Sequence, residues 1–132
     1  MSLSITDALL ACGGPMTENG GVWEWRLRPG PDFPGFAGHF PGNPVLPAAV
    51  QLVMARLLWQ KAAGSDAQPG FARVKCTRPI GPGEELLVRL SPGRKGRLDC
   101  AILVLPPAAD SGREDAAASE QAAVMTLLAP EA

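Results

Sequence analysis

The chain contains one histidine, His39, which stands beside three prolines at positions 41, 44 and 47. In an extended polyproline conformation, this spacing of three residues puts all three rings on one side of a stiff ribbon. An apolar segment follows Pro47, and this residue suits the first position of a helix. A rigid loop can present a single polar side chain to the N-terminus of such a helix. His39 is therefore a candidate general base.

The start of that helix would complement a base. Its first backbone N–H groups, with those of Ala48, Ala49 and Val50 as candidates, lack partners inside a helix and favour an oxygen that carries negative charge. His39 could remove a proton from an acidic C–H bond while these N–H groups stabilise the enolate-like oxygen that develops. The alternative is that His39 only forms a structural hydrogen bond within a proline-rich loop.

Hydrophobic periodicity predicts the elements that position these residues. A short helix begins near Ser4 and ends at Gly13-Gly14-Pro15, and a nearly apolar helix spans about 47–61. Residues 29–47 are expected to form an ordered loop, and 106–121 a long mobile connection. Alternating or apolar runs predict strands at 22–28, 71–78, 85–90, 98–105 and 122–128. This order predicts an α+β fold in one domain over 1–132, with an antiparallel sheet wrapped around one buried helix.

Composition limits the classes of function. The chain has 132 residues, of which 46% are hydrophobic and 19% charged, as in an ordinary globular domain. No apolar run reaches the roughly 20 residues of a membrane span, and no secretion signal is expected at the N-terminus. Three scattered cysteines and one histidine predict no metal site. The lack of a basic run with interleaved aromatics argues against nucleic acid. A reduced, cytoplasmic protein is expected.

Two segments resemble one enzyme family. Residues 38–47, GHFPGNPVLP, followed by Gln51-Leu52, resemble the signature of the 3-hydroxyacyl-acyl-carrier-protein dehydratases. Residues 74–83, VKCTRPIGPG, are similar to the strand and turn that follow the central helix of that family. The likeness spans most of residues 4–105. It implies a hot-dog fold, usually dimeric, and a substrate carried as a thioester on phosphopantetheine, by an acyl carrier protein or coenzyme A. No cofactor is expected.

The resemblance also implies a role for each motif residue. His39 would remove the C2 proton, and the N–H groups of Ala48 and Ala49 would hold the thioester carbonyl. The family has glycine where this chain has Ala48, which still supplies a backbone N–H. A Glu or Asp on the central helix of the other subunit helps the 3-hydroxyl leave in that family. Its position falls here at Val53, and valine can neither donate nor accept a proton.

The loss of a general acid typically costs about 10²–10⁴ in rate, so a substitute would matter. Gln51 lies about 200° around the helix from Val53 and is expected to face elsewhere. Arg56 lies three residues further on, nearer the face of Val53, and its guanidinium could hold a leaving hydroxyl. The alternative is that Arg56 only extends its charge outward from a mostly buried helix.

The sequence leaves three functions open. The first is a 3-hydroxyacyl-thioester dehydratase of fatty-acid or related acyl-chain biosynthesis, with His39 as the base. The second is an accessory subunit that keeps the acyl groove without the chemistry, which Val53 favours. The third is double-bond isomerisation or thioester hydrolysis, which would need a base but not the second carboxyl group.

Charge is unevenly spread along the chain. Residues 51–100 carry nine Lys and Arg against four Asp and Glu, and this basic stretch could attract an acidic partner. Six residues are expected to contact the substrate, its phosphate arm or an acidic carrier: Phe40, Pro41, Lys75, Arg78, Arg94 and Lys95. The alternative for the four basic residues is that they are ordinary exposed charges on strands and turns.

Overall fold

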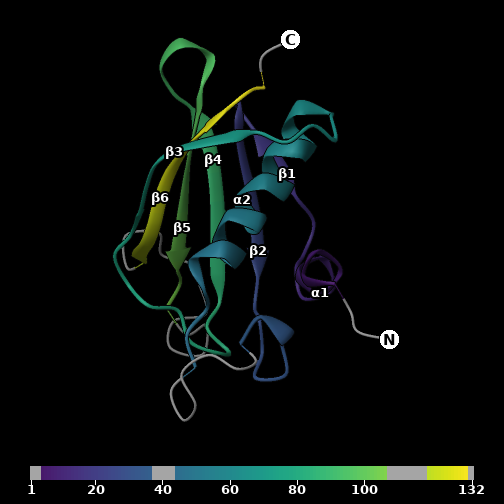
Figure 1. The fold of residues 1–132 in the computed structure, drawn as a ribbon, viewed down its shortest axis with the longest axis vertical. Helices are drawn as coiled ribbons and strands as arrows, with labels where there is room; N and C mark the ends of the chain where they lie inside the picture. The colour runs from purple at the N-terminus through teal and green to yellow at the C-terminus, as the bar shows by residue number, and fades with distance from the viewer. Residues whose placement is uncertain (1–3, 37–43, 107–118, 131–132) are drawn as a thin grey trace.

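The computed structural model describes residues 4–36, 44–106 and 119–130. These residues form one curved antiparallel sheet with a long helix lying across it (Figure 1). The helices are α1 (Ile5–Ala11) and α2 (Ala48–Ala63), with short 3-10 turns η1 (Pro34–Phe36) and η2 (Arg94–Gly96). The strands are β1 (Thr17–Asn19), β2 (Val22–Leu27), β3 (Gly70–Cys76), β4 (Leu86–Pro92), β5 (Leu98–Val104) and β6 (Glu120–Leu128).

The sheet does not follow the order of the chain. Its strands are arranged β1-β2-β4-β5-β6-β3, and every described pair is antiparallel. The chain passes directly from β3 to β4, yet these strands do not pair, because β3 bonds to β6 at the edge of the sheet. The turn predicted at Gly81–Gly83 is therefore part of a crossing connection and not of a hairpin. The end of β3 and the segment after it thereby line a common surface with the start of α2.

The core lies between α2 and the face of the sheet that it covers. The alternation predicted for residues 22–28 is confirmed, since Trp25 and Leu27 of β2 are buried while Arg28 is exposed. One face of α2 supplies the opposing side chains: Val50, Gln51, Met54, Ala55, Leu58 and Trp59. The predicted α+β architecture, an antiparallel sheet around one central helix, is confirmed.

Both ends of α2 differ slightly from the sequence prediction. Pro47 is the N-cap residue, with φ −65° and ψ 152°, and not the first helical residue. The helix ends at Ala63 instead of near Lys61, because Gly64 takes the left-handed conformation with φ 63° that glycine adopts at low cost. The N-terminus of α1 follows the prediction, since Ser4 Oγ accepts a hydrogen bond from the Asp7 N–H at 3.0 Å.

Two strands also differ from the sequence prediction. β1 lies where the sequence indicated only a turn before β2. β6 begins at Glu120, so the predicted connection over 106–121 is shorter than expected. Its central part, residues 107–118, lies outside the described residues.

Candidate functional site

A groove of about 350 Å³ lies between the start of α2 and the segment that follows β3. Its lining residues are Val45, Leu46, Pro47, Ala48, Gln51, Cys76, Thr77, Arg78 and Pro79. These residues come from the two segments whose sequences resemble the dehydratase signature. The crossing from β3 to β4 is what brings them together.

The first turn of α2 opens onto this groove. The N–H groups of Val50 and Gln51 both donate to the carbonyl of Pro47, at 3.1 and 3.2 Å. In the described part of the chain, the N–H groups of Ala48 and Ala49 have no acceptor. Ala48 and Ala49 are exposed, and Ala48 lines the groove, so the start of the helix can offer an N–H group to an oxygen atom there. The Val50 N–H, a third candidate from the sequence, is already engaged.

Leu46 holds one wall of the groove in position. Its N–H donates to the carbonyl of Ile80 at 2.8 Å, and its own carbonyl accepts from Gln51 Nε2 at 3.2 Å. Leu46 and Ile80 are both buried. The short extended segment before α2 is therefore fixed to the chain that follows β3 and to the helix itself.

Gln51 was not among the site residues proposed from the sequence. It is the buried polar side chain of the described core, only 3% exposed, and it lines the groove. Besides the bond to Leu46, its Oε1 accepts from Cys76 Sγ at 4.0 Å. A glutamine within the otherwise apolar first two turns of the helix, three residues after its first residue, is the sequence signal that could have identified it.

Three of the predicted residues, His39, Phe40 and Pro41, lie outside the described residues, which resume at Pro44. Val53 is half-buried and packs against the core, and it does not line the groove.

Arg56 extends away from the groove. Its Nη1 donates to Gln68 Oε1 at 3.3 Å and its Nη2 to Thr6 Oγ1 at 3.4 Å. These contacts join α2 to α1 and to the loop after α2. The structure thus brings Gln51 to the groove and keeps Arg56 away from it within this chain.

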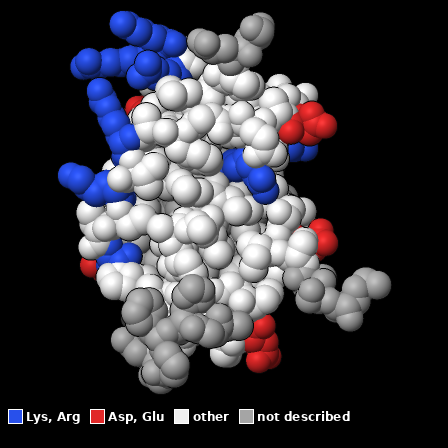
Figure 2. Space-filling view, in the orientation of Figure 1, with Lys and Arg blue, Asp and Glu red and all other residues white. Residues whose placement is uncertain are grey.

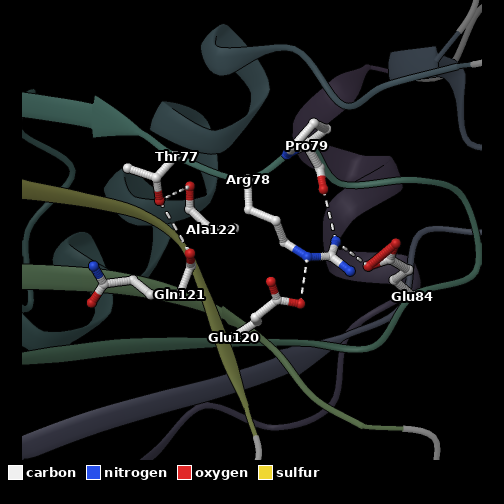
Figure 3. Close-up of polar contacts among 7 residues, drawn as sticks. All are labelled: Thr77, Arg78, Pro79, Glu84, Glu120, Gln121 and Ala122. Atoms are coloured by element: carbon white, nitrogen blue, oxygen red, sulfur yellow. Dashed lines mark hydrogen bonds and ion pairs between the residues drawn. The ribbon is translucent and has the colours of Figure 1, made fainter.

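Arg78 lines the groove, but its guanidinium is occupied by two carboxylates (Figure 3). Nη1 donates to Glu84 Oε2 at 2.5 Å and to the Pro79 carbonyl at 2.7 Å, and Nε donates to Glu120 Oε1 at 3.1 Å. Burial opposes the charge of Arg78, yet its hydrogen bonds to Glu120 and Glu84 outweigh this effect and raise the pKa of the guanidinium. Arg78 therefore acts first as a link between β6 and the turn before β4.

The other predicted basic residues fall at two separate places. Lys75 is exposed on β3, next to the groove residue Cys76. Arg94 and Lys95 form the tip between β4 and β5, at the end of the molecule opposite to the start of α2 (Figure 1). In the same orientation, Figure 2 shows Lys and Arg side chains gathered around that end. Arg73 and Arg97 are further exposed basic residues that the sequence did not single out.

Within the described ranges, no group of three or more His, Cys, Asp or Glu side chains could hold a metal ion. The cysteines differ in environment: Cys12 is half-buried, Cys76 is exposed and Cys100 is buried. Burial raises the pKa of the Cys100 thiol to about 12. None of the described helices is long and apolar enough to cross a membrane.

Three solved structures share this architecture. The dehydratase heterocomplex ApeI:P from Xenorhabdus doucetiae matches with a TM-score of 0.64 and 20% identity, over 88% of this chain and 94% of that chain. An uncharacterized protein from Erwinia carotovora subsp. atroseptica gives 0.61 and 22%, over 88% and 90%. The erythromycin dehydratase gives 0.64 and 20%, over 85% of this chain and 41% of that chain. At these identities the likeness concerns the fold, which is the hot-dog fold.

Among curated proteins, none matches this sequence significantly. The sequence model of one protein family, ApeI-like and described as ApeI dehydratase, matches residues 16–103. The matched region extends from β1 to β5 and includes both walls of the groove. The chain belongs to the ApeI-like dehydratase family.

Proposed function

We propose that this protein is a dehydratase that acts on 3-hydroxyacyl groups carried as thioesters, on an acyl carrier protein or coenzyme A. One observation carries the proposal: in the described structure, the N–H groups of Ala48 and Ala49 have no acceptor at the start of a helix that lines a groove, and this helix begins seven residues after the His-Phe-Pro motif in the sequence. Membership of the ApeI-like family supports the same reaction class. Two solved structures described as dehydratases have the same fold, and this likeness does not identify a substrate.

The proposed reaction needs one base and one oxygen-binding site. His39 takes the C2 proton, and the Ala48 and Ala49 N–H groups stabilise the negative charge that develops on the thioester oxygen. As the C2–C3 double bond forms, the C3–O bond breaks, and the hydroxyl leaves as water with the proton returned by the His39 imidazolium. The product is a 2-enoyl thioester. This route balances without the carboxylic acid that Val53 replaces, at the cost of a slower departure of the hydroxyl.

Val53 also favours a second candidate, an accessory subunit. In the family that the sequence resembles, the acid comes from the central helix of the other subunit. Two identical copies of this chain would lack it at both sites, whereas a related chain that keeps the acid would complete the site of His39. The relative from Xenorhabdus doucetiae is described as a heterocomplex, which makes such a pairing a reasonable candidate here.

The proposal includes an assembly and a cellular role. Among the described strands, β3 lies at one edge of the sheet and exposes the side chain of Val74, and such edges pair readily with a second chain. A homodimer, or a larger assembly of dimers, is the state proposed for this chain when no related partner is present. We assign it to fatty-acid or related acyl-chain biosynthesis in the cytoplasm, with Lys75, Arg94 and Lys95 as contacts for an acidic carrier.

The decisive experiment offers the purified chain 3-hydroxyacyl pantetheine thioesters of several chain lengths and identifies the products by mass. Loss of one water, abolished in His39→Ala, is the expected result. Loss of the acyl group or an isomer of unchanged mass would indicate hydrolysis or isomerisation instead. If thioesters bind to the chain but no product forms, the accessory role replaces the catalytic one. If no thioester of any length binds, both candidates fail.

A further inference from the structure

We propose that Gln51 is a positioning residue, which sets the width of the groove by holding its two walls to the first turn of α2. One wall is the segment Val45–Pro47 and the other is the end of β3 at Cys76. The inference rests on the proposed function, because it concerns the groove that would hold the acyl thioester.

The burial of Gln51 requires its amide to be bonded. Only 3% of the residue is exposed, and an amide transferred from water to an apolar core without hydrogen bonds is costly. Its Nε2 donates to the Leu46 carbonyl at 3.2 Å, and its Oε1 accepts from Cys76 Sγ at 4.0 Å. The donor and the acceptor of one side chain thus reach opposite walls of the groove.

The position of Gln51 on the helix explains this reach. Gln51 lies three residues after Ala48, so the two side chains leave the same face of α2. Through the Leu46 carbonyl, Gln51 fixes the peptide that leads into Pro47, whose own carbonyl accepts the N–H groups of Val50 and Gln51. The Ala48 and Ala49 N–H groups therefore keep their direction only while this peptide is held.

The other end of α2 offers a matched control. Gln60 Nε2 also donates to the carbonyls of a flanking loop, at 2.8 Å to Ala67 and 3.3 Å to Asp66. Its partners lie after the helix, far from the groove. Gln51→Met and Gln60→Met each remove one side-chain amide from the same helix and keep a side chain of similar length. Because Gln60 is only half-buried, the comparison concerns ligand affinity of the folded variants and not their stability, and a purely structural role predicts similar affinities for both.

The first test measures binding of a pantetheine amide of a 3-hydroxyacyl group, in which nitrogen replaces the thioester sulfur. Gln51→Met leaves the Leu46 carbonyl buried without a donor, so the affinity should fall about tenfold. The affinity of Gln60→Met should stay within about twofold of the original chain. Equal losses in the two variants would overturn the inference.

The second test needs no ligand. It compares the hydrogen-exchange protection factor of the Leu46 amide, which reports whether the wall stays bonded to Ile80. In Gln51→Glu, a neutral carboxylic acid can donate to the Leu46 carbonyl and a carboxylate cannot. Protection should be high at acidic pH and fall as this carboxyl ionises, whereas Gln51→Met should show low protection throughout.

The titratable groups near Gln51 in the described structure are the Cys76 thiol, which contacts it, and Arg78, which lines the same groove and is bound to Glu84 and Glu120. These groups are also present in the original chain, so the Leu46 protection factor of the original chain, measured over the same pH range, serves as the reference. A protection factor of Leu46 that is unaffected in Gln51→Met would overturn the inference. If the exchange results hold but no acyl amide binds to the original chain, the proposed function fails while the positioning role of Gln51 stands.

Discussion

Arg78 Nη1 lies 2.5 Å from Glu84 Oε2, and this ion pair closes the turn between β3 and β4 beside the groove (Figure 3). The same guanidinium reaches Glu120 on β6 at 3.1 Å. Arg78 and Glu84 are both partly buried, with 28% and 30% of their side chains exposed, whereas Glu120 is 68% exposed. The pair therefore connects the edge of the sheet to the crossing segment that forms one wall of the groove.

Replacing Arg78 should destabilise this region. Arg78→Met removes both charged contacts and leaves Glu84 partly buried without its partner, so the free energy of unfolding should fall by about 1–3 kcal/mol. Urea denaturation measures the change. Glu120→Gln removes only the more exposed contact and should cost less than about 1 kcal/mol. A larger loss in Glu120→Gln than in Arg78→Met would contradict this ranking.

Restoring the acid at Val53 should raise dehydratase activity. Val53→Asp introduces a group that can protonate the departing hydroxyl, and a positioned acid typically contributes about 10²–10⁴ in rate. The measurement is kcat with a 3-hydroxyacyl thioester. Leu52→Asp is the control, since Leu52 is also half-buried and directly adjacent. A folded Val53→Asp variant that gains no more than Leu52→Asp would show that the acid position inferred by resemblance does not act here.

The buried Cys100 thiol should make stability depend on alkaline pH. Its ordinary pKa is 9.0, and burial raises the folded value to about 12. Between these pH values the unfolded chain releases a proton that the folded chain retains. The stability is fully present below about pH 9 and falls as pH rises toward the folded pKa, by up to about 1.4 kcal/mol for each pH unit. Urea denaturation from pH 8 to 11 measures the slope.

Cys100→Ala provides the comparison for this slope. Below about pH 9 the variant should be less stable than the original chain, because a small cavity replaces the sulfur. Its stability should nevertheless decline less steeply above pH 9 than that of the original chain. Two parallel curves would mean that the thiol does not contribute to the pH dependence.

The position of Lys75 beside the groove predicts the stronger effect on carrier binding. Lys75→Glu should weaken binding of an acyl carrier protein about three- to tenfold at low salt. Arg94→Glu should weaken it less, because the β4–β5 tip lies at the end of the molecule opposite to the start of α2 and its groove (Figure 1). Lys61→Glu, at the exposed end of α2, is the charge-matched control.

Salt should distinguish a charge effect from a change in shape. At about 1 M salt the Debye length is near 3 Å, so the difference between Lys75→Glu and the original chain should largely disappear. If Arg94→Glu has the larger effect, the carrier docks at the tip of the sheet. If neither variant changes the affinity, none of these exposed charges contributes to carrier binding.

Most helices and strands could be predicted from the sequence, but the pairing of the strands in the sheet could not. The apolar run after Pro47 and the alternation around Trp25 follow from local periodicity, and both the buried helix and the strand are confirmed. Periodicity carries no information on which strands pair, so the placement of β3 beside β6 needed the structure. Arg73 in β3 also adopts a positive φ of 55°, which the sequence did not predict because this conformation is usual for glycine and not for arginine.

The candidate site shows the same division. The sequence identified Ala48 because the start of a helix can be located from its pattern. It suggested that the Arg56 guanidinium could hold the leaving hydroxyl in place of the missing acid, and it passed over Gln51, since only the angle from Val53 was considered. The actual direction of each side chain depends on its neighbours: Arg56 bonds to Thr6, which lies 50 residues earlier, and Gln51 to Leu46. Such contacts depend on tertiary packing, which spacing does not give.

Gly13 should tolerate no side chain, although its neighbour Gly14 should. A Cβ atom on Gly13 would lie 2.5 Å from Trp25 Nε1, whereas the nearest atom to a Cβ on Gly14 is 3.9 Å away. Trp25 is buried and donates from Nε1 to the Gly14 carbonyl at 3.0 Å, so the ring cannot move without losing this bond. Gly13→Ala should therefore lower the free energy of unfolding by about 1–3 kcal/mol and shift the tryptophan fluorescence. Gly14→Ala should change stability by less than about 0.5 kcal/mol. Equal effects of the two substitutions would mean that Trp25 does not pack against Gly13 as described.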